Sequence, residues 1–205
     1  MGCLFPCNLG GFDEVSKKLY YNSMDIWTVL GRYSQLETER LWLRPFRFDD
    51  SQDFYKITHN PANLTFIFPA QVSQAESDYL LVHYFMKEPL GIWALEDKAS
   101  QQMIGAICLE KLNPTKQTAE IGYFVQQDFW GQGLATESLK TISFLALAEF
   151  GLRSLSIITH RENLASQKVA LKAGFKLARA FKGSDRYSRK MRDYLEFQLK
   201  AGEVL

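Results

Sequence analysis

The chain has 205 residues, 46% of them hydrophobic, which is enough to bury one substantial core. Its 24 basic and 23 acidic side chains leave a net charge of +1, so the overall charge does not favour nucleic acid or an anionic membrane as a partner. The apolar stretches are much shorter than the roughly 20 residues of a membrane helix. The three cysteines have no spacing with histidine that suits a metal. We therefore expect a globular protein of the reducing cytoplasm, with no metal, no nucleic-acid partner and no membrane contact.

The N-terminal segment does not share the pattern of the rest of the chain. Residues 1–23 lack the Ser or Thr that a myristoylation signal needs, because Pro6 stands there, and they lack the basic start and apolar core of a secretory signal. We interpret them as a tail, with Met24 as an alternative translation start, inside an N-terminal extension of residues 1–35. Residues 36–205 are expected to form one domain.

The first half of this domain predicts one strand and two helices. Alternating apolar residues indicate a strand from Thr38 to Phe46 with Arg40 and Arg44 on its exposed face. The predicted helices are Ser51 to His59, after a capping Asp49 or Asp50, and Gln74 to Met86, with Ala75, Tyr79, Val82 and Met86 at helical spacing. Between them, residues 61–72 are expected to form a loop that helps to build a substrate pocket.

The second half predicts a meander, a long helix and a closing hairpin. The expected strands are Gly91 to Glu96, Met103 to Lys111, Glu120 to Gln126 and Leu155 to His160, with Phe175 to Phe181 pairing with Arg192 to Leu199. The long helix is expected from Leu134 to Phe150. This order of elements is typical of an α/β (α+β) domain.

The loop between the third of these strands and the long helix has the features of an anion-binding site. Gly131 and Gly133 lack the Cβ that would block close approach, so their backbone N–H groups can form a nest in front of the unpaired amides of the helix start. A pyrophosphate would fit there. Leu134 replaces the Lys of a Walker loop, and Thr136 replaces the third glycine of a Rossmann fingerprint, so nucleoside triphosphates and dinucleotides are disfavoured.

Three segments of the chain carry a resemblance to a known family. Trp130-Gly131-Gln132-Gly133-Leu134-Ala135 resembles the pyrophosphate loop Q/R-x-x-G-x-G/A of the GNAT acetyltransferases, with Trp130 in the Gln/Arg place. The extended form Trp-Gly-x-Gly-x-Ala-Thr-Glu is similar to the RimJ and RimL branch, the ribosomal-protein N-terminal acetyltransferases. The segment from Leu36 to Phe46 and the pattern N-x-x-S…K-x-G-F, from Asn163 to Phe175, are similar to that branch as well.

The resemblance runs from about Leu36 to Gln198 and implies a fold, a cosubstrate and a set of binding residues. The implied fold is a mostly antiparallel mixed sheet of about seven strands, splayed between the fourth strand, Glu120 to Gln126, and the fifth, Leu155 to His160, and flanked by about four helices. The implied cosubstrate is acetyl-CoA. The implied binding residues are Phe124, Val125, Trp130, Gly131, Gln132, Gly133, Leu134, Ala135, Thr136, Asn163 and Ser166.

Catalytic residues are harder to assign. Many GNAT enzymes place a Tyr where this chain has Ala170, whereas the RimJ and RimL branch places a Ser at Ser166, which we take as the candidate acid for the leaving thiolate. A polar residue in the first turn of a helix capped by Asn163 is the structural alternative. Glu120 and His160 are candidate general bases.

One further carboxylate, Glu137, has an ordinary explanation. It lies in the first turn of the long helix, where the helix dipole favours negative charge, so a structural role is the stronger interpretation.

The leading hypothesis is an acetyl-CoA-dependent N-acetyltransferase that acts on a primary amine by direct attack in a ternary complex. An α-amine has a pKa near 8, against about 10.4 for Lys, so a peptide N-terminus needs less help from a base. A small-molecule acetyltransferase and a catalytically idle acyl-CoA-binding module remain as alternatives. The loop of residues 61–72 contains no acid to hold a polycation, which favours a peptide or a hydrophobic amine. Both a monomer and a homodimer fit the sequence.

Overall fold

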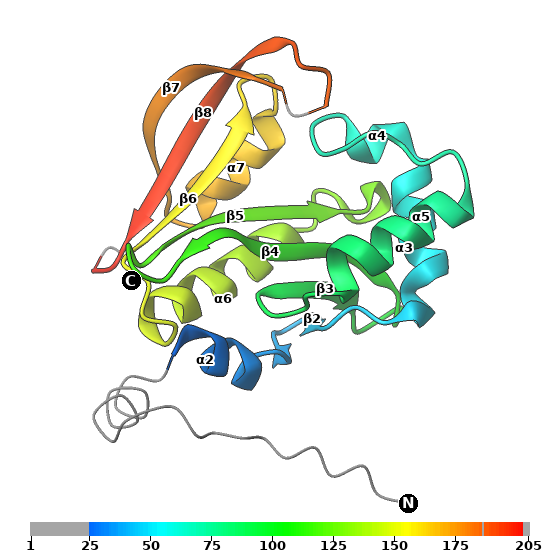
Figure 1. Ribbon diagram of the computed structural model, residues 1–205, viewed down its shortest axis with the longest axis horizontal. Helices are drawn as coiled ribbons and strands as arrows, with labels where there is room; N and C mark the ends of the chain where they lie inside the picture. The colour runs from blue at the N-terminus through cyan, green and yellow to red at the C-terminus, as the bar shows by residue number, and fades with distance from the viewer. Residues whose placement is uncertain (1–24, 186, 203–205) are drawn as a thin grey trace, which may run out of the picture.

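A computed structural model describes residues 25–185 and 187–202. The predicted tail of residues 1–23 and the alternative start Met24 lie outside this part of the chain. The described residues form one twisted sheet with helices on both faces (Figure 1).

The sheet contains eight strands within the described residues, in the order β1-β2-β3-β4-β5-β6-β8-β7. Their bounds are β1 Leu36–Glu37, β2 Leu41–Arg44, β3 Ile92–Asp97, β4 Met103–Asn113, β5 Thr118–Val125, β6 Ser154–His160, β7 Lys176–Ser184 and β8 Met191–Lys200. Neighbouring strands are antiparallel except β5 and β6, which are parallel. The predicted α/β (α+β) class with a mixed, mostly antiparallel sheet is therefore confirmed.

The first predicted strand, Thr38 to Phe46, is shorter in the structure, because β2 covers only Leu41–Arg44 and residues 38–40 form the turn of a hairpin with β1. The chain turns between β1 and β2, where Thr38 N–H donates to the Leu41 carbonyl (2.9 Å) and Leu41 N–H donates back to Thr38 Oγ1 (3.0 Å). The side-chain hydroxyl of Thr38 thus supports a turn that strand periodicity alone does not indicate. The hairpin adds the strand that the expected seven lacked.

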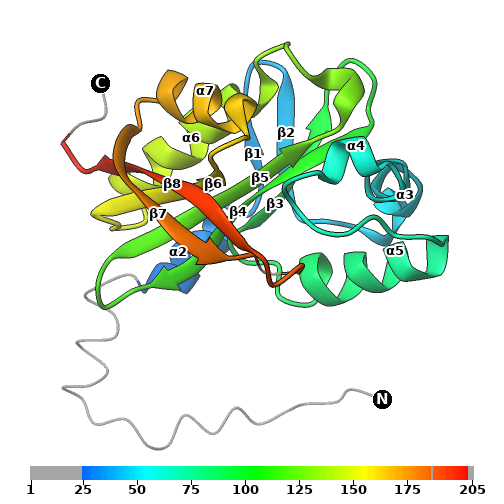
Figure 2. The ribbon, with the colours of Figure 1, turned by 90° about the horizontal axis from the view of Figure 1, so that it is seen from above.

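The helices form two layers. One face carries α2 Ile26–Arg32, α6 Leu134–Ala148 and α7 Leu164–Lys172, and the other carries α3 Ser51–His59, α4 Pro61–Leu64, α5 Gln74–Leu80 and the π-helix η2 Leu81–Met86. Figure 2 shows α6 and α7 on the side of the sheet opposite α3, α4 and α5. Each layer has its own core cluster. Strand alternation sends Ile121 and Val125 into the first cluster and Phe124 into the second.

The helix α2 was not predicted. Asp25 caps it by accepting from Trp27 N–H (3.0 Å), and Ile26, Val29 and Leu30 are buried in the core. The indole of Trp93 on β3 donates to the backbone carbonyl of Tyr33 just after the helix (2.9 Å). The segment that precedes the first strand is therefore packed onto the sheet.

Two expectations about exposure were also wrong. Arg44 is only 7% exposed, because the carboxylates of Asp50 (2.7 Å) and Glu96 pair with its guanidinium. Tyr79 is 61% exposed, while Ser77 of α5 and Leu81 of η2 are fully buried, so this helical segment presents a different face to the core than its apolar spacing suggested. In both cases packing against neighbouring elements overrides local periodicity.

The expected loop of residues 61–72 begins with a short helix. Asn60 caps α4 by accepting from Ala62 N–H (3.0 Å), and Pro61 occupies the first helical position. Leu64, at its end, is buried in the core. The remainder stays a loop, in which Phe66 packs against His160 of β6 and Phe68 against Phe124 of β5.

The predicted splay in the sheet is present between β5 and β6. The two strands pair only from Thr118–Ser154 to Glu120–Ser156 and then diverge, while β6 stays paired with β8 along its whole length (Figure 1). In the implied family numbering these are the fourth and fifth strands. The hairpin shifts the numbering by one.

Candidate active site

A large cavity lies where β5 and β6 separate. Its volume is about 1430 Å³, and its walls come from both splayed strands, the loop at residues 65–69, the glycine loop before α6, the start of α7 and the turn between β7 and β8. Ordinary small-molecule sites measure roughly 300–1,000 Å³. The cavity is therefore large enough for a long cosubstrate together with an acceptor.

The glycine loop forms an open cradle at the start of α6. Gly131 has φ of 77° and Gly133 has φ of 82°, a left-handed conformation that residues with a Cβ rarely adopt. A Cβ built on Gly131 would meet nothing within 4 Å, and one on Gly133 would meet only the Arg40 guanidinium at 3.6 Å. No side chain caps α6, so the amides of its first turn remain available to an anion.

The loop is held in place from outside the cavity. Arg40 Nη1 donates to the Gln132 carbonyl (2.7 Å), and Arg40 Nε donates to Glu137 Oε2 (2.7 Å). The other oxygen of Glu137 accepts from Thr38 Oγ1 (2.6 Å) and from Arg40 N–H (2.9 Å). Burial raises the pKa of Glu137, but these hydrogen bonds outweigh it and hold the pKa below its ordinary value. Glu137 thus connects α6 to the β1–β2 hairpin. Of the six residues from Trp130 to Ala135, five line the cavity, and the exception is Gln132.

Two backbone amides of β5 point into the gap. The Gln117 carbonyl accepts from Ser154 N–H on the β6 side (3.3 Å), and Gln126 N–H donates to the Ile104 carbonyl on the β4 side (2.7 Å). Because successive residues of a strand alternate in direction, the amides of Tyr123 and Val125, which lie beyond the last β5–β6 pair (Glu120–Ser156), face the gap. The amide of Phe124 points toward β4 instead. Its ring packs against Phe68 and Phe85, on the face of the sheet that α3, α4 and α5 cover.

The unusual tryptophan of the loop contacts this edge. Trp130 Nε1 donates to the Val125 carbonyl (2.6 Å), and the indole is 49% exposed at the cavity wall. The carbonyl of Val125 is therefore occupied by the protein, while its N–H still faces the gap.

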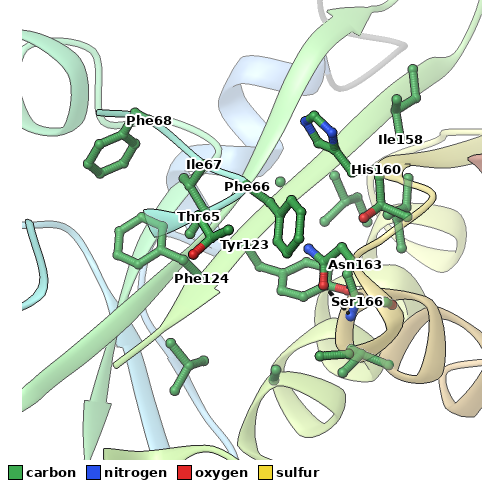
Figure 3. Close-up of a pocket in the computed structure, with 18 of the residues that line it drawn as sticks. Thr65, Phe66, Ile67, Phe68, Tyr123, Phe124, Ile158, His160, Asn163 and Ser166 are labelled. Atoms are coloured by element: carbon green, nitrogen blue, oxygen red, sulfur yellow. Dashed lines mark hydrogen bonds between the residues drawn. The ribbon is translucent and has the colours of Figure 1, made fainter. Parts of the chain in front are cut away.

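The start of α7 closes the other side of the gap. Asn163 Oδ1 accepts from Ser166 N–H (3.0 Å), which is the predicted helix cap. The Ser166 hydroxyl lies 2.9 Å from the Tyr123 hydroxyl, and the Tyr123 hydroxyl also reaches the Ser166 backbone carbonyl (3.2 Å; Figure 3). Ala170, in the place of the usual Tyr, is fully buried in the core and does not line the cavity.

Sequence reasoning missed Tyr123 as a site residue. Burial raises its pKa to about 12, although the hydrogen bond with Ser166 acts in the opposite direction. The available signal was its place on β5, on the same face as Ile121 and Val125. The partner, 43 residues further along the chain, could not be identified from sequence.

His160 lies at the open end of β6 among aromatic rings. Its ring centroid is 5.4 Å from that of Phe66 and 4.6 Å from that of Tyr194. Its Nε2 is 3.6 Å from Asp185 Oδ2, on the turn between β7 and β8. Hydrogen bonds from Ser188 hold the pKa of Asp185 below its ordinary value, so this carboxylate is charged at neutral pH.

Glu120 lies at the closed end of the gap. Lys111 Nζ pairs with it at 2.7 Å, and Glu110 faces it across the β4–β5 ladder. By register Glu120 is level with Ser156, four residues before His160, which corresponds to about 13 Å along a strand. The structure therefore separates the two candidate bases.

Two further predictions concern a metal ion and a membrane-spanning helix. Among residues 25–185 and 187–202, no group of three or more His, Cys, Asp or Glu side chains is placed to hold a metal ion. Within the same ranges, none of the helices is both long and apolar enough to cross a membrane.

The geometry agrees with the comparisons with known proteins. A family model described as an acetyltransferase (GNAT) domain matches residues 40–176, so the chain belongs to the GNAT acetyltransferases and is an acyltransferase enzyme. It is 26% identical over 144 residues to the uncharacterized N-acetyltransferase YoaA of Bacillus subtilis, covering 68% of this chain and 81% of that protein. It is 31% identical over 84 residues to a ribosomal-protein-serine acetyltransferase of Escherichia coli, covering 41% and 47% of the two chains.

Solved structures show the same fold. A structure of RimL, described as a ribosomal L7/L12 α-N-protein acetyltransferase in complex with coenzyme A, superposes with a TM-score of 0.66 at 21% identity, over 81% of this chain and 97% of that one. The predicted resemblance to the GNAT acetyltransferases is confirmed by the family model, and the ribosomal-protein-serine acetyltransferase among the relatives supports the predicted likeness to the RimJ and RimL branch.

Proposed function

We propose that this N-acetyltransferase transfers the acetyl group of acetyl-CoA directly to the α-amine of a peptide N-terminus. The observation that carries the proposal is the gap between β5 and β6, which connects the glycine cradle to an aromatic pocket containing His160. A thioester lying in such a gap would have its phosphates on one side of the sheet and its acetyl group on the other.

The cosubstrate would bind mainly through backbone. The pyrophosphate would take the amides from Gly131 to Thr136 and the positive end of α6. The pantetheine arm would extend along β5 as an added strand, bonding the amide of Tyr123 and leaving the Val125 N–H for the thioester, with Asn163 on the opposite wall. Because the Val125 carbonyl already accepts a hydrogen bond from Trp130, Val125 offers the thioester only its N–H as a donor.

The acetyl transfer would be a single attack followed by collapse. The amine nitrogen attacks the thioester carbonyl carbon, and the carbonyl oxygen becomes an oxyanion that the Val125 N–H stabilises. On collapse the C–S bond breaks and sulfur leaves with the electron pair, meeting the Ser166 hydroxyl. The nitrogen loses its extra proton to His160, whose positive charge would then face the Asp185 carboxylate 3.6 Å away. Glu120 is held by Lys111 and lies far from this end of the gap, so we assign it a structural or acceptor-binding role.

The cysteine in the cavity wall supports direct attack over a covalent intermediate. Burial and the nearby Glu110 carboxylate raise the pKa of Cys108 far above its ordinary value. At neutral pH it stays a thiol, which is a poor nucleophile. An acetyl-cysteine enzyme would need a thiolate at this position.

The preference for an α-amine follows from protonation and from the pocket wall. At pH 7.5, about a quarter of an α-amine is neutral, against about 0.1% of a lysine side chain. The loop at the cavity wall is apolar and carries Phe66, Ile67 and Phe68, which suits a peptide side chain next to the amine.

A polyamine acceptor is the second candidate, because the structure brings carboxylates to the cavity from elements other than this loop. The carboxylates are those of Glu110, Glu120, Glu162 and Asp185. Such groups could hold a second positive charge of a small amine.

A competition experiment separates these acceptors. The enzyme is incubated with acetyl-CoA and an equimolar mixture of a peptide with a free N-terminus, a blocked peptide that contains lysine, and spermidine, and each product is measured by mass spectrometry. We expect the free N-terminus to be labelled first. Preferential labelling of lysine or spermidine would refute the α-amine proposal while the acetyltransferase assignment stands. Absence of CoA release with all acceptors would favour an idle acyl-CoA-binding module.

Cellular location and oligomeric state stay predictions. A reducing cytoplasm agrees with the unpaired thiol of Cys108, and both a monomer and a homodimer remain compatible with the site.

A further inference from the structure

The half-buried contact between Tyr123 and Ser166 joins the two walls of the splayed gap. Tyr123 belongs to β5 and Ser166 to the first turn of α7, and their hydroxyl oxygens are 2.9 Å apart. The Tyr123 hydroxyl is also 3.2 Å from the Ser166 backbone carbonyl. A phenol has one hydrogen, so it can serve only one of these two acceptors fully at a time.

Two hydrogen-bond arrangements fit these distances. In the first, the phenol donates to the Ser166 carbonyl and the serine hydroxyl donates to the phenol oxygen. In the second, the phenol donates to Ser166 Oγ, and the serine hydrogen is free to point into the gap. The heavy atoms do not move between the two arrangements, because only the hydroxyl hydrogens rotate.

We propose that Tyr123 is a positioning residue for thiolate departure, because it holds Ser166 Oγ across the gap and donates to it when the C–S bond breaks. As negative charge develops on sulfur, the second arrangement becomes favourable, since only it lets the serine hydroxyl donate to sulfur. The electron pair of the C–S bond stays on sulfur, and the proton lost by the amine leaves through the general base. The proposal rests on the assignment of Ser166 as the group that meets the leaving sulfur.

The phenol proton itself is not transferred in this step. The pKa of Tyr123 is raised to about 12, because the phenol is buried. An ordinary thiol has a pKa of about 8.5, so moving the phenol proton to the thiolate would be unfavourable by roughly three orders of magnitude. Tyr123 therefore orients and polarises the serine hydroxyl, and it remains protonated throughout.

The test is a double-mutant cycle with Tyr123→Phe, Ser166→Ala and the combined variant, measured as kcat and KM for acetyl-CoA. Removing a single hydroxyl that acts in the transition state should lower kcat about tenfold in Tyr123→Phe and leave KM within about twofold. In the Ser166→Ala background the same change should cost less than twofold. Tyr33→Phe is the matched control, because Tyr33 packs against Phe150 in the core and does not line the cavity.

The outcomes are separable. If Ser166→Ala turns over at the wild-type rate, the assignment of Ser166 fails, and Tyr123 with it. If Ser166→Ala is slow but Tyr123→Phe has the wild-type kcat, only the positioning role is refuted. The same holds if the loss of kcat in the double variant equals the product of the losses in the two single variants. A lowered melting temperature with unchanged kcat would show a purely structural hydroxyl.

The pH profile adds an independent check. We expect Tyr123→Phe to lower kcat by the same factor at every pH from 6 to 10, so that the shape of the pH profile does not change. A high-pH decline in the wild type that disappears in this variant would mean that the phenol is a proton donor and would overturn the positioning role.

Discussion

Replacing Glu137 with Gln should loosen the glycine cradle without touching it. The carboxylate accepts from Thr38 Oγ1, from Arg40 N–H and from the Arg40 guanidinium. An amide in the same place directs an N–H₂ group at one of these donors. A hydrogen bond to a charged group contributes about 1.5–3 kcal/mol, and exposure of the Arg40 side chain (43%) places the loss at the lower end, about 2 kcal/mol in all.

This estimate converts into two measurable shifts. For a chain of this size 1 kcal/mol corresponds to about 2–4 °C, so the melting temperature should fall by about 4–8 °C. A released Arg40 would also lose its bond to the Gln132 carbonyl. If that single bond contributes about 1 kcal/mol to ordering the loop, the affinity for acetyl-CoA should fall about fivefold. Thermal denaturation and isothermal titration calorimetry measure the two quantities.

The effect should depend on pH in a defined direction. The pKa of Glu137 is lowered in the folded protein, so its stabilisation is complete above the unfolded value, near 4.3, and is lost as the pH falls through the folded pKa. The difference in melting temperature between Glu137→Gln and the wild type should therefore be largest at pH 7 and shrink below about pH 4. Glu39→Gln, an exposed neighbour, controls for the change in charge. Wild-type stability and affinity in Glu137→Gln at pH 7 would refute the reasoning.

The remaining predictions concern the cradle, the base and the sheet. Gly133→Val should abolish acetyl-CoA binding in calorimetry. Gly151 has a similar positive φ but lies outside the cavity, so Gly151→Val should lower stability without affecting binding. Retained binding in Gly133→Val would show that the glycine loop does not bind the cosubstrate. His160→Gln should lower kcat about a hundredfold near neutral pH, and Glu120→Gln less than threefold; the reverse order would exchange the two roles. Gly105→Ala should lower the melting temperature by several degrees, because its Cβ would lie about 2.2 Å from the Phe124 carbonyl oxygen; an unchanged melting temperature would contradict this close approach.

Sequence was most informative where the physical cause was local. The glycine loop could be found because two residues free of Cβ stand directly before a helical pattern, and both have the positive φ that such a loop requires. The long helix and the strands of the meander were placed to within a few residues, because hydrophobic periodicity reports which side faces a core. The hairpin at Thr38 and the helix α2 were missed, since their signals were a single hydroxyl and a single capping carboxylate.

The interactions within the site were decided by tertiary structure. Arg40 meets Glu137 across 97 positions, Tyr123 meets Ser166 across 43, and His160 at the end of β6 lies near a carboxylate on the turn between β7 and β8. Each residue type could be read from the sequence, but which side chains face one another depends on how β5 and β6 diverge and on the packing of α7 against β6. The sequence by itself therefore determined the family, the sheet and the position of the anion cradle, because these depend on periodicity and backbone conformation. Only the folded chain decided which hydroxyl meets Ser166 and which carboxylate supports His160, because side-chain pairing across a gap is a property of distance in space.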